Sequence, residues 1–165
     1  MIVVDVGCHA HPAHDGASQD SISQLIARFH PRVVYGFDPH PGLPVGSTIE
    51  GGARVIRERR AAWLRDGTVG FTSDPARPLG ARVTEHEGES VPCFDLAAFL
   101  GEKLIEGEIV LKLDAEGAEY QLLSRIIDEG VDEFLTLILV EWHDRRRWQA
   151  RRRLQRALRC PVEPW

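Results

Sequence analysis

The segment IVLKLDAEGAEYQLLSRIIDEG, residues 109–130, changes its hydrophobic pattern halfway along. Up to Leu113 it is aliphatic except for Lys112, which is typical of a strand buried on both faces of a sheet. From Glu116 to Glu129 apolar residues recur at helical spacing, and Gly130 is well suited to end a helix in a left-handed conformation. The segment therefore predicts a buried strand that leads directly into an amphipathic helix.

The same alternation extends over the whole chain. Five segments have the composition of buried strands, namely 2–6, 32–38, part of 53–63, 108–114 and 134–142. Four segments follow the helical pattern: one that Ser18 can cap and that runs to Phe29, then 94–102, 116–129 and a basic closing helix within 144–160. Alternating strands and helices over 165 residues predict a single domain, 1–165, with a doubly wound, mostly parallel α/β sheet.

Two further segments predict local structure outside this alternation. The Asp66-Gly67 pair lies between strand-forming residues, which predicts a hairpin within 64–74. Residues 75–90 are rich in proline, glycine and charge, which favours a surface excursion.

Composition narrows the class of protein. The chain is 43% hydrophobic and 27% charged, as in globular proteins. Its longest apolar run, 134–140, is far shorter than the roughly 20 residues that a membrane-spanning helix needs. The start, MIVVDVG, reads as a strand rather than a signal sequence, and the three cysteines have no metal-like spacing. We therefore expect reduced thiols in a cytoplasmic protein that has no membrane partner.

Charge is unevenly distributed along the chain. The formal net charge is −5, yet residues 145–159 hold eight arginines and no acid. The usual interpretation is the solvated face of a helix, and the alternative is a phosphate- or RNA-binding surface with Trp148 for stacking. The acidic remainder of the chain argues against general affinity for nucleic acid.

Polar residues stand where the predicted strands end. They are Asp5 and Gly7, Asp38, Asp114 and Glu116, and Glu141 and His143. In open parallel sheets, ligands bind beyond the carboxyl ends of the strands, at the point where strand order reverses. The pattern therefore predicts one shared cleft.

Two of these positions suit a nucleoside. Asp38 ends the second strand about 30 residues after Gly7, where an acid can accept hydrogen bonds from both ribose hydroxyls. The alternative role for Asp38 is that of a turn residue before Pro39. Gly7 lets the backbone approach a ligand closely. The chain contains no G-x-G-x-x-G, which disfavours a dinucleotide phosphate site.

Several motifs together resemble a known family. VVDVG, VVYGFDPHP, RRAAWLRDGTVGF, VPCFDLAAFL, IVLKLDAEGAEYQLL and LILVEWH follow the order and spacing of the FkbM-like branch of class I S-adenosylmethionine-dependent methyltransferases, from about residue 2 to 143. KLDAEGAEY is the most specific of them. The resemblance implies a Rossmann-like fold, S-adenosylmethionine as cofactor and methyl transfer to a hydroxyl of a small molecule or glycan.

The resemblance also implies residue roles. Asp5 and Gly7 would shape the cofactor loop. In that loop, His9 stands where the family usually has a small polar residue, and His11 stands where it usually has glycine. Asp38 would hold the ribose, and Ala61, Ala62 and Trp63 would lie near the adenine. Asp114 and Glu116 would face the methionine end and the acceptor. With only CPVEPW after the last helix, the chain would be a minimal member whose C-terminal antiparallel strands are reduced or absent.

A hydroxyl acceptor must lose its proton, and His143 is the best candidate base because imidazole titrates near neutrality. Asp114 could also cap the helix after it, with Glu116 and Glu119 in the first turn, and this role can coexist with ligand contact.

The loop HAHPAHD also raises the question of a metal. Asp114, Glu141 and His143 could complete a site with this loop, but its spacing matches no metal motif. A loop that contacts substrate is favoured, and no metal is expected. Two other functions compete with methyl transfer. One is that of a non-catalytic binding module that acts through the basic helix, and the other is that of a metal-dependent hydrolase that uses the histidine-rich loop.

Overall fold

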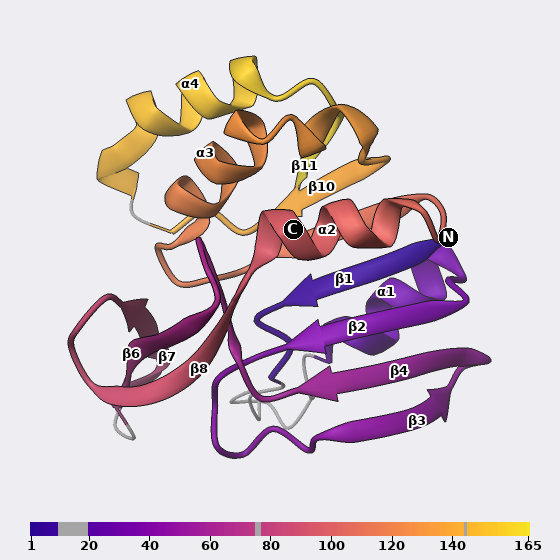
Figure 1. Ribbon diagram of the computed structural model, residues 1–165, viewed down its shortest axis with the longest axis horizontal. Coiled ribbons are helices and arrows are strands. Elements are labelled where there is room, and N and C mark those ends of the chain that lie inside the picture. Colours follow the sequence, from indigo (N-terminus) through magenta and orange to yellow (C-terminus); the bar gives the residue numbers. More distant parts are fainter. Residues whose placement is uncertain (10–19, 75–76, 144) are drawn as a thin grey trace.

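The computed structural model describes residues 1–9, 20–74, 77–143 and 145–165. They form a seven-stranded sheet in the order β11-β10-β9-β1-β2-β4-β3, in which only β3–β4 is an antiparallel pair (Figure 1). Its strands are β1 (Ile2–Val6), β2 (Val33–Phe37), β3 (Gly46–Glu50), β4 (Ala53–Glu58), β9 (Ile109–Leu113), β10 (Leu137–Val140) and β11 (Val162–Pro164). The predicted α/β class with a mostly parallel sheet is confirmed.

A four-stranded sheet lies beyond the carboxyl ends of β1, β2 and β4 (Figure 1). Its order is β5-β8-β6-β7, and its strands are β5 (Ala61–Trp63), β6 (Gly67–Asp74), β7 (Arg77–Thr84) and β8 (Glu89–Asp95). Phe71 and Val91 of this sheet join the same apolar cluster as Ile2 and Val4 of β1. The two sheets thus share one core.

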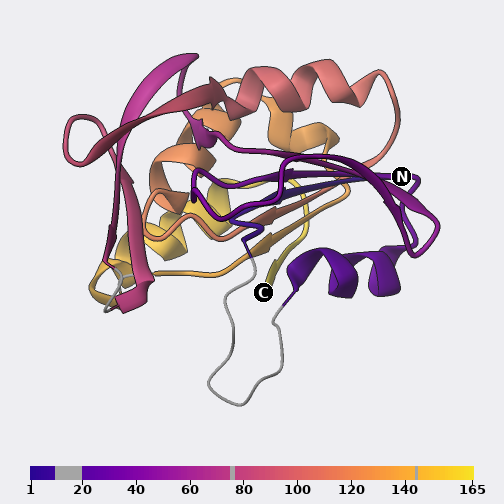
Figure 2. The same ribbon diagram turned by 90° about the horizontal axis from the view of Figure 1, so that it is seen from below.

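Helices cover both faces of the larger sheet (Figure 2). They are α1 (Ser21–Phe29), α2 (Leu96–Leu104), α3 (Glu119–Asp128) and α4 (Trp148–Ala157), with short 3-10 helices η1 (Val131–Phe134) and η2 (Arg145–Arg147). Ile22 of α1 packs with Val3 and Val34 on one face, whereas Leu100 of α2 and Leu122 of α3 pack on the other. Both faces of β1 are therefore buried, as its apolar composition predicts.

The strand order reverses at β1. From β1 the chain continues to β2 on one side and returns later to β9 on the other, so that Asp5 is level with both Gly36 and Lys112. The carboxyl ends of these three parallel strands consequently meet at one edge, where a crevice is expected.

The predicted hairpin within 64–74 is wrong. β5 pairs in parallel with β8, and β8 separates it from β6. The Asp66-Gly67 turn therefore joins strands that are not neighbours. β6 pairs antiparallel with both β8 and β7, and β7 lies in the segment expected to be an excursion. Local turn chemistry does not show that a later strand, β8, will insert between β5 and β6.

The C-terminal residues form β11, a parallel edge strand beside β10 that the sequence did not predict. Pro164 is tolerated there because the outer side of an edge strand needs no N–H donor. β10 itself covers only 137–140 of the predicted 134–142, since Phe134 ends η1 and is 65% exposed.

Helix starts also differ from expectation. The carboxylate of Asp20 accepts the Ile22 N–H and caps α1, while Ser18 lies outside the described residues. α3 begins at Glu119 rather than Glu116 and has no side-chain cap, so the capping role of Asp114 is wrong. Its other end follows the prediction, because Gly130 adopts a left-handed conformation with φ of 70°.

The described residues include no helix long and apolar enough to cross a membrane. The cysteines Cys8, Cys93 and Cys160 are free and buried. Within the predicted basic helix, the described residues form η2 and α4, and Trp148 is 54% exposed. A role of this surface in binding an anionic partner stays a prediction.

Candidate active site

A cavity of about 510 Å³ lies at the carboxyl edge of the parallel strands. It is walled partly by the larger sheet and partly by Phe71 and Val83 of the smaller one. Of the predicted site residues, those that line it are Gly7, His9, Asp38, Ala61, Ala62, Asp114, Glu116 and Glu141. Four strands thus deliver polar residues to one space.

Asp38 is held in place by two loops. Its Oδ2 accepts the His9 N–H at 3.1 Å, and its Oδ1 accepts the His40 N–H at 2.8 Å. The imidazole rings of His9 and His40 stack with centroids 4.0 Å apart beside it. A carboxylate offers about four acceptor positions, and the N–H groups of the described residues occupy two of them, so roughly two remain for a ligand in the cavity.

Gly7 is required for a packing reason that the sequence did not predict. Its φ is 79°, and a Cβ there would overlap the carbonyl oxygen of Asp114. The loop after β1 therefore packs directly on the end of β9, and glycine permits that contact. Close approach to a ligand is not needed to explain this glycine.

Lys112 is a central residue of the site that the sequence reasoning missed. Its side chain is 1% exposed, and Nζ donates to the Gly7 carbonyl at 2.8 Å and lies 3.2 Å from Asp5 Oδ1 and 3.3 Å from Asp114 Oδ2. Burial disfavours its charge, but the carboxylates of Asp5 and Asp114 outweigh burial and raise the pKa of Lys112. The available signal was a lone charge within an aliphatic strand.

Two residues expected near the cofactor do not reach the cavity. Asp5 is fully buried, where it accepts the Ser21 hydroxyl at 2.6 Å and pairs with Lys112. Trp63 is 2% exposed within the core shared by the two sheets. Both are displaced from ligand contact because their strands are covered on both faces. His11 lies outside the described residues.

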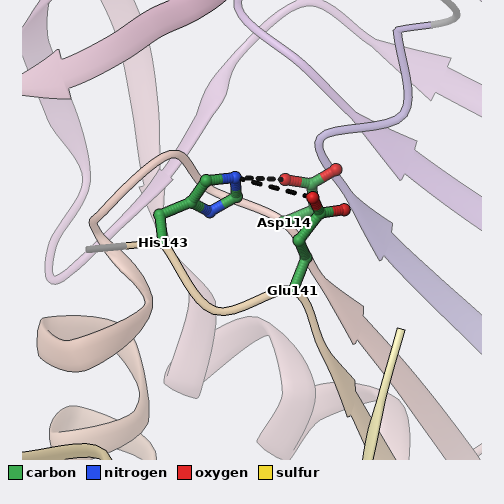
Figure 3. Close-up of side chains that lie close together, drawn as sticks. All are labelled: Asp114, Glu141 and His143. Carbon is green, nitrogen blue, oxygen red and sulfur yellow. Dashed lines mark ion pairs between the residues drawn. The ribbon is translucent and has the colours of Figure 1, made fainter. Parts of the chain in front are cut away.

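His143 sits among carboxylates behind the cavity wall. Its Nδ1 lies 2.8 Å from Oε1 of Glu119, a fully buried residue. Its Nε2 lies 3.7 Å from Asp114 Oδ1 and 3.8 Å from Glu141 Oε1 (Figure 3). The same nitrogen lies 3.5 Å from Glu116 Oε2. The hydrogen bond with Glu119 raises the pKa of His143 to about 9. Without a bound metal ion the ring therefore holds its proton at neutral pH, which disfavours the predicted role of His143 as base.

Glu116 has the properties of a base instead. It lines the cavity, and burial raises the pKa of its carboxyl to about 7. Its φ of 48° is unusual for a residue with a side chain and indicates strain of a kind that gathers at functional sites. Glu119 stabilises this conformation by accepting the N–H groups of Ala115 and Gly117 at 3.0 Å.

No family model, no curated protein and no solved structure matches this chain. Functional assignment therefore depends on the cavity and on the residues that surround it.

Proposed function

We propose that this protein is an S-adenosylmethionine-dependent methyltransferase with a Rossmann-like fold that methylates a hydroxyl of a small molecule or glycan. The observation that carries the proposal is that Asp38 and the pair Asp114 and Glu116 open into the same cavity at the reversal of strand order. Parallel sheets bind nucleotide-like ligands at this place.

The residues that line the cavity fit the parts of this cofactor. Asp38 retains acceptor positions for the ribose hydroxyls, and Ala61 and Ala62 provide an apolar wall for the adenine. Asp114 and Glu116 place negative charge where a sulfonium would need it. When bound, S-adenosylmethionine supplies an activated methyl group.

Different residues of the chain would deprotonate the acceptor hydroxyl and hold the surrounding groups in position. Glu116 takes its proton, because this carboxylate reaches the cavity and its pKa is about 7. Lys112 fixes Asp114 from behind, and Glu119 fixes the loop that carries Glu116. The catalytic contribution is thus mainly the alignment of the reacting groups.

Isothermal titration with S-adenosylmethionine and S-adenosylhomocysteine tests the proposal. Asp38→Ala should weaken binding of either ligand by about 1.5–3 kcal/mol, the worth of hydrogen bonds to a charged group. Asp128→Ala, which removes a carboxyl from the end of α3, serves as the control and should bind normally. A folded wild-type protein that binds neither ligand would contradict the assignment and favour a non-catalytic binding module.

A further inference from the structure

We propose that Asp114, Glu141 and His143 form a site for a divalent transition-metal ion on the wall of the cavity (Figure 3). One ligand atom from each of the three lies within 4.8 Å of the other two. The site uses described residues alone and needs no ligand from the histidine-rich loop. It comes from the ends of β9 and β10, which are neighbouring parallel strands.

The imidazole is oriented as metal-binding histidines are. Its Nδ1 is engaged by Glu119, so Nε2 is the nitrogen that faces Asp114 and Glu141. A carboxylate on the far nitrogen fixes the ring and strengthens the other nitrogen as a ligand. Glu119 is itself held in position, because it is fully buried and accepts hydrogen bonds from the Ala115 and Gly117 amides.

Each of the two carboxylates also has an oxygen atom that can coordinate an ion. Lys112 occupies Oδ2 of Asp114, which leaves Oδ1 directed toward His143. Oε1 of Glu141 lies 3.8 Å from the same nitrogen, and Glu116 Oε2 is 3.5 Å from it. Lys112 contacts Asp5 as well as Asp114, so its single charge does not neutralise this group of acids.

The spacing and the donor types indicate the kind of ion. Ligands about 2.0–2.2 Å from one ion lie roughly 3–3.5 Å apart, so side-chain shifts below about 1 Å would close the site. One imidazole with two carboxylates suits Mn²⁺, Fe²⁺ or Zn²⁺ better than Ca²⁺. Asp114 and Glu141 both line the cavity, which leaves further coordination positions open to a bound molecule.

The role of the ion rests on the proposed function. A metal at this place would bind the acceptor hydroxyl and lower its pKa, which would ease loss of the hydroxyl proton. Binding of the ion itself does not depend on S-adenosylmethionine. The two proposals can therefore fail separately.

Untagged protein treated with a chelator should be titrated with Mn²⁺ alone, and free Mn²⁺ followed by electron paramagnetic resonance. We expect one ion bound per chain and, for Glu141→Gln, affinity at least about tenfold weaker with an unchanged melting temperature. Glu129→Gln is the matched control, since the Glu129 and Glu141 side chains are 47% and 49% exposed. It should bind as wild type does.

Two results would overturn the site. One is a folded wild-type protein that binds no Mn²⁺, which would leave an ion-pair cluster around a protonated imidazole. The other is equal affinity in Glu141→Gln and wild type, which would mean that Mn²⁺ binds elsewhere on an acidic surface.

Discussion

Replacing Lys112 with methionine should destabilise the protein far more than replacing an exposed charged residue does. The substitution keeps the apolar stem but leaves Asp5 fully buried with the Ser21 hydroxyl as its hydrogen-bond donor among the described residues, and it removes the donor to the Gly7 carbonyl. Breaking a buried ion pair on one side costs about 3–5 kcal/mol. For a chain of this length, that corresponds to a melting temperature lower by about 6–20 °C.

The chain offers a matched control in its other lysine. Lys103 pairs with Glu106 at the surface, and its side chain is 21% exposed. Lys103→Met should cost at most about 1 kcal/mol, as exposed ion pairs do. Urea unfolding followed by tryptophan fluorescence measures both variants.

A double variant tests the assigned cause. Adding Asp5→Asn to Lys112→Met removes the buried carboxylate charge that Lys112→Met leaves without a counter-charge. The loss of unfolding free energy in the double variant should therefore be about 1–3 kcal/mol smaller than the sum of the losses in the two single variants. Additive effects, or a Lys112→Met cost no larger than that of Lys103→Met, would refute the idea that Lys112 exists to neutralise buried carboxylates.

Two further predictions concern stability. Gly7→Ala should destabilise the protein more than Gly52→Ala does. Both glycines have positive φ, but of the two only Gly7 stands where an added Cβ would overlap a backbone atom. Thermal melts should show a stability loss of about 1 kcal/mol for Gly52→Ala and a larger loss for Gly7→Ala. The hydrogen bonds from Arg57 lower the pKa of Glu50 from 4.5 to about 2, so this carboxylate stabilises the fold above pH 4.5 and loses its contribution as the pH falls toward 2. The stability difference between wild type and Glu50→Gln should therefore shrink below pH 4.5, and a difference independent of pH would contradict the pairing.

The wider architecture was accessible from short-range patterns. Aliphatic runs such as IVVDV and IVLKL identified β1 and β9, and the alternation of strands with helices indicated a parallel sheet. The gathering of strand-end carboxylates followed from parallel topology alone, since all such ends meet at one edge. Asp38, Asp114 and Glu141 accordingly line one cavity.

Other features depended on which strands became neighbours. β8 lies between β5 and β6, and β11 continues the sheet beside β10, although no local pattern indicates either arrangement. The start of α3 moved because Glu119 bonds to amides of the preceding loop, an interaction that competes with a helical turn at Glu116.

The sequence by itself determined the class of fold and the edge at which chemistry can occur, because hydrophobic periodicity is set by residues a few positions apart. Only the tertiary structure decided that Lys112 holds Asp5 and Asp114, and that Glu119 directs His143 toward two carboxylates. Those contacts join residues up to 107 positions apart. They depend on strand register, and therefore on the packing of the whole sheet rather than on any single segment.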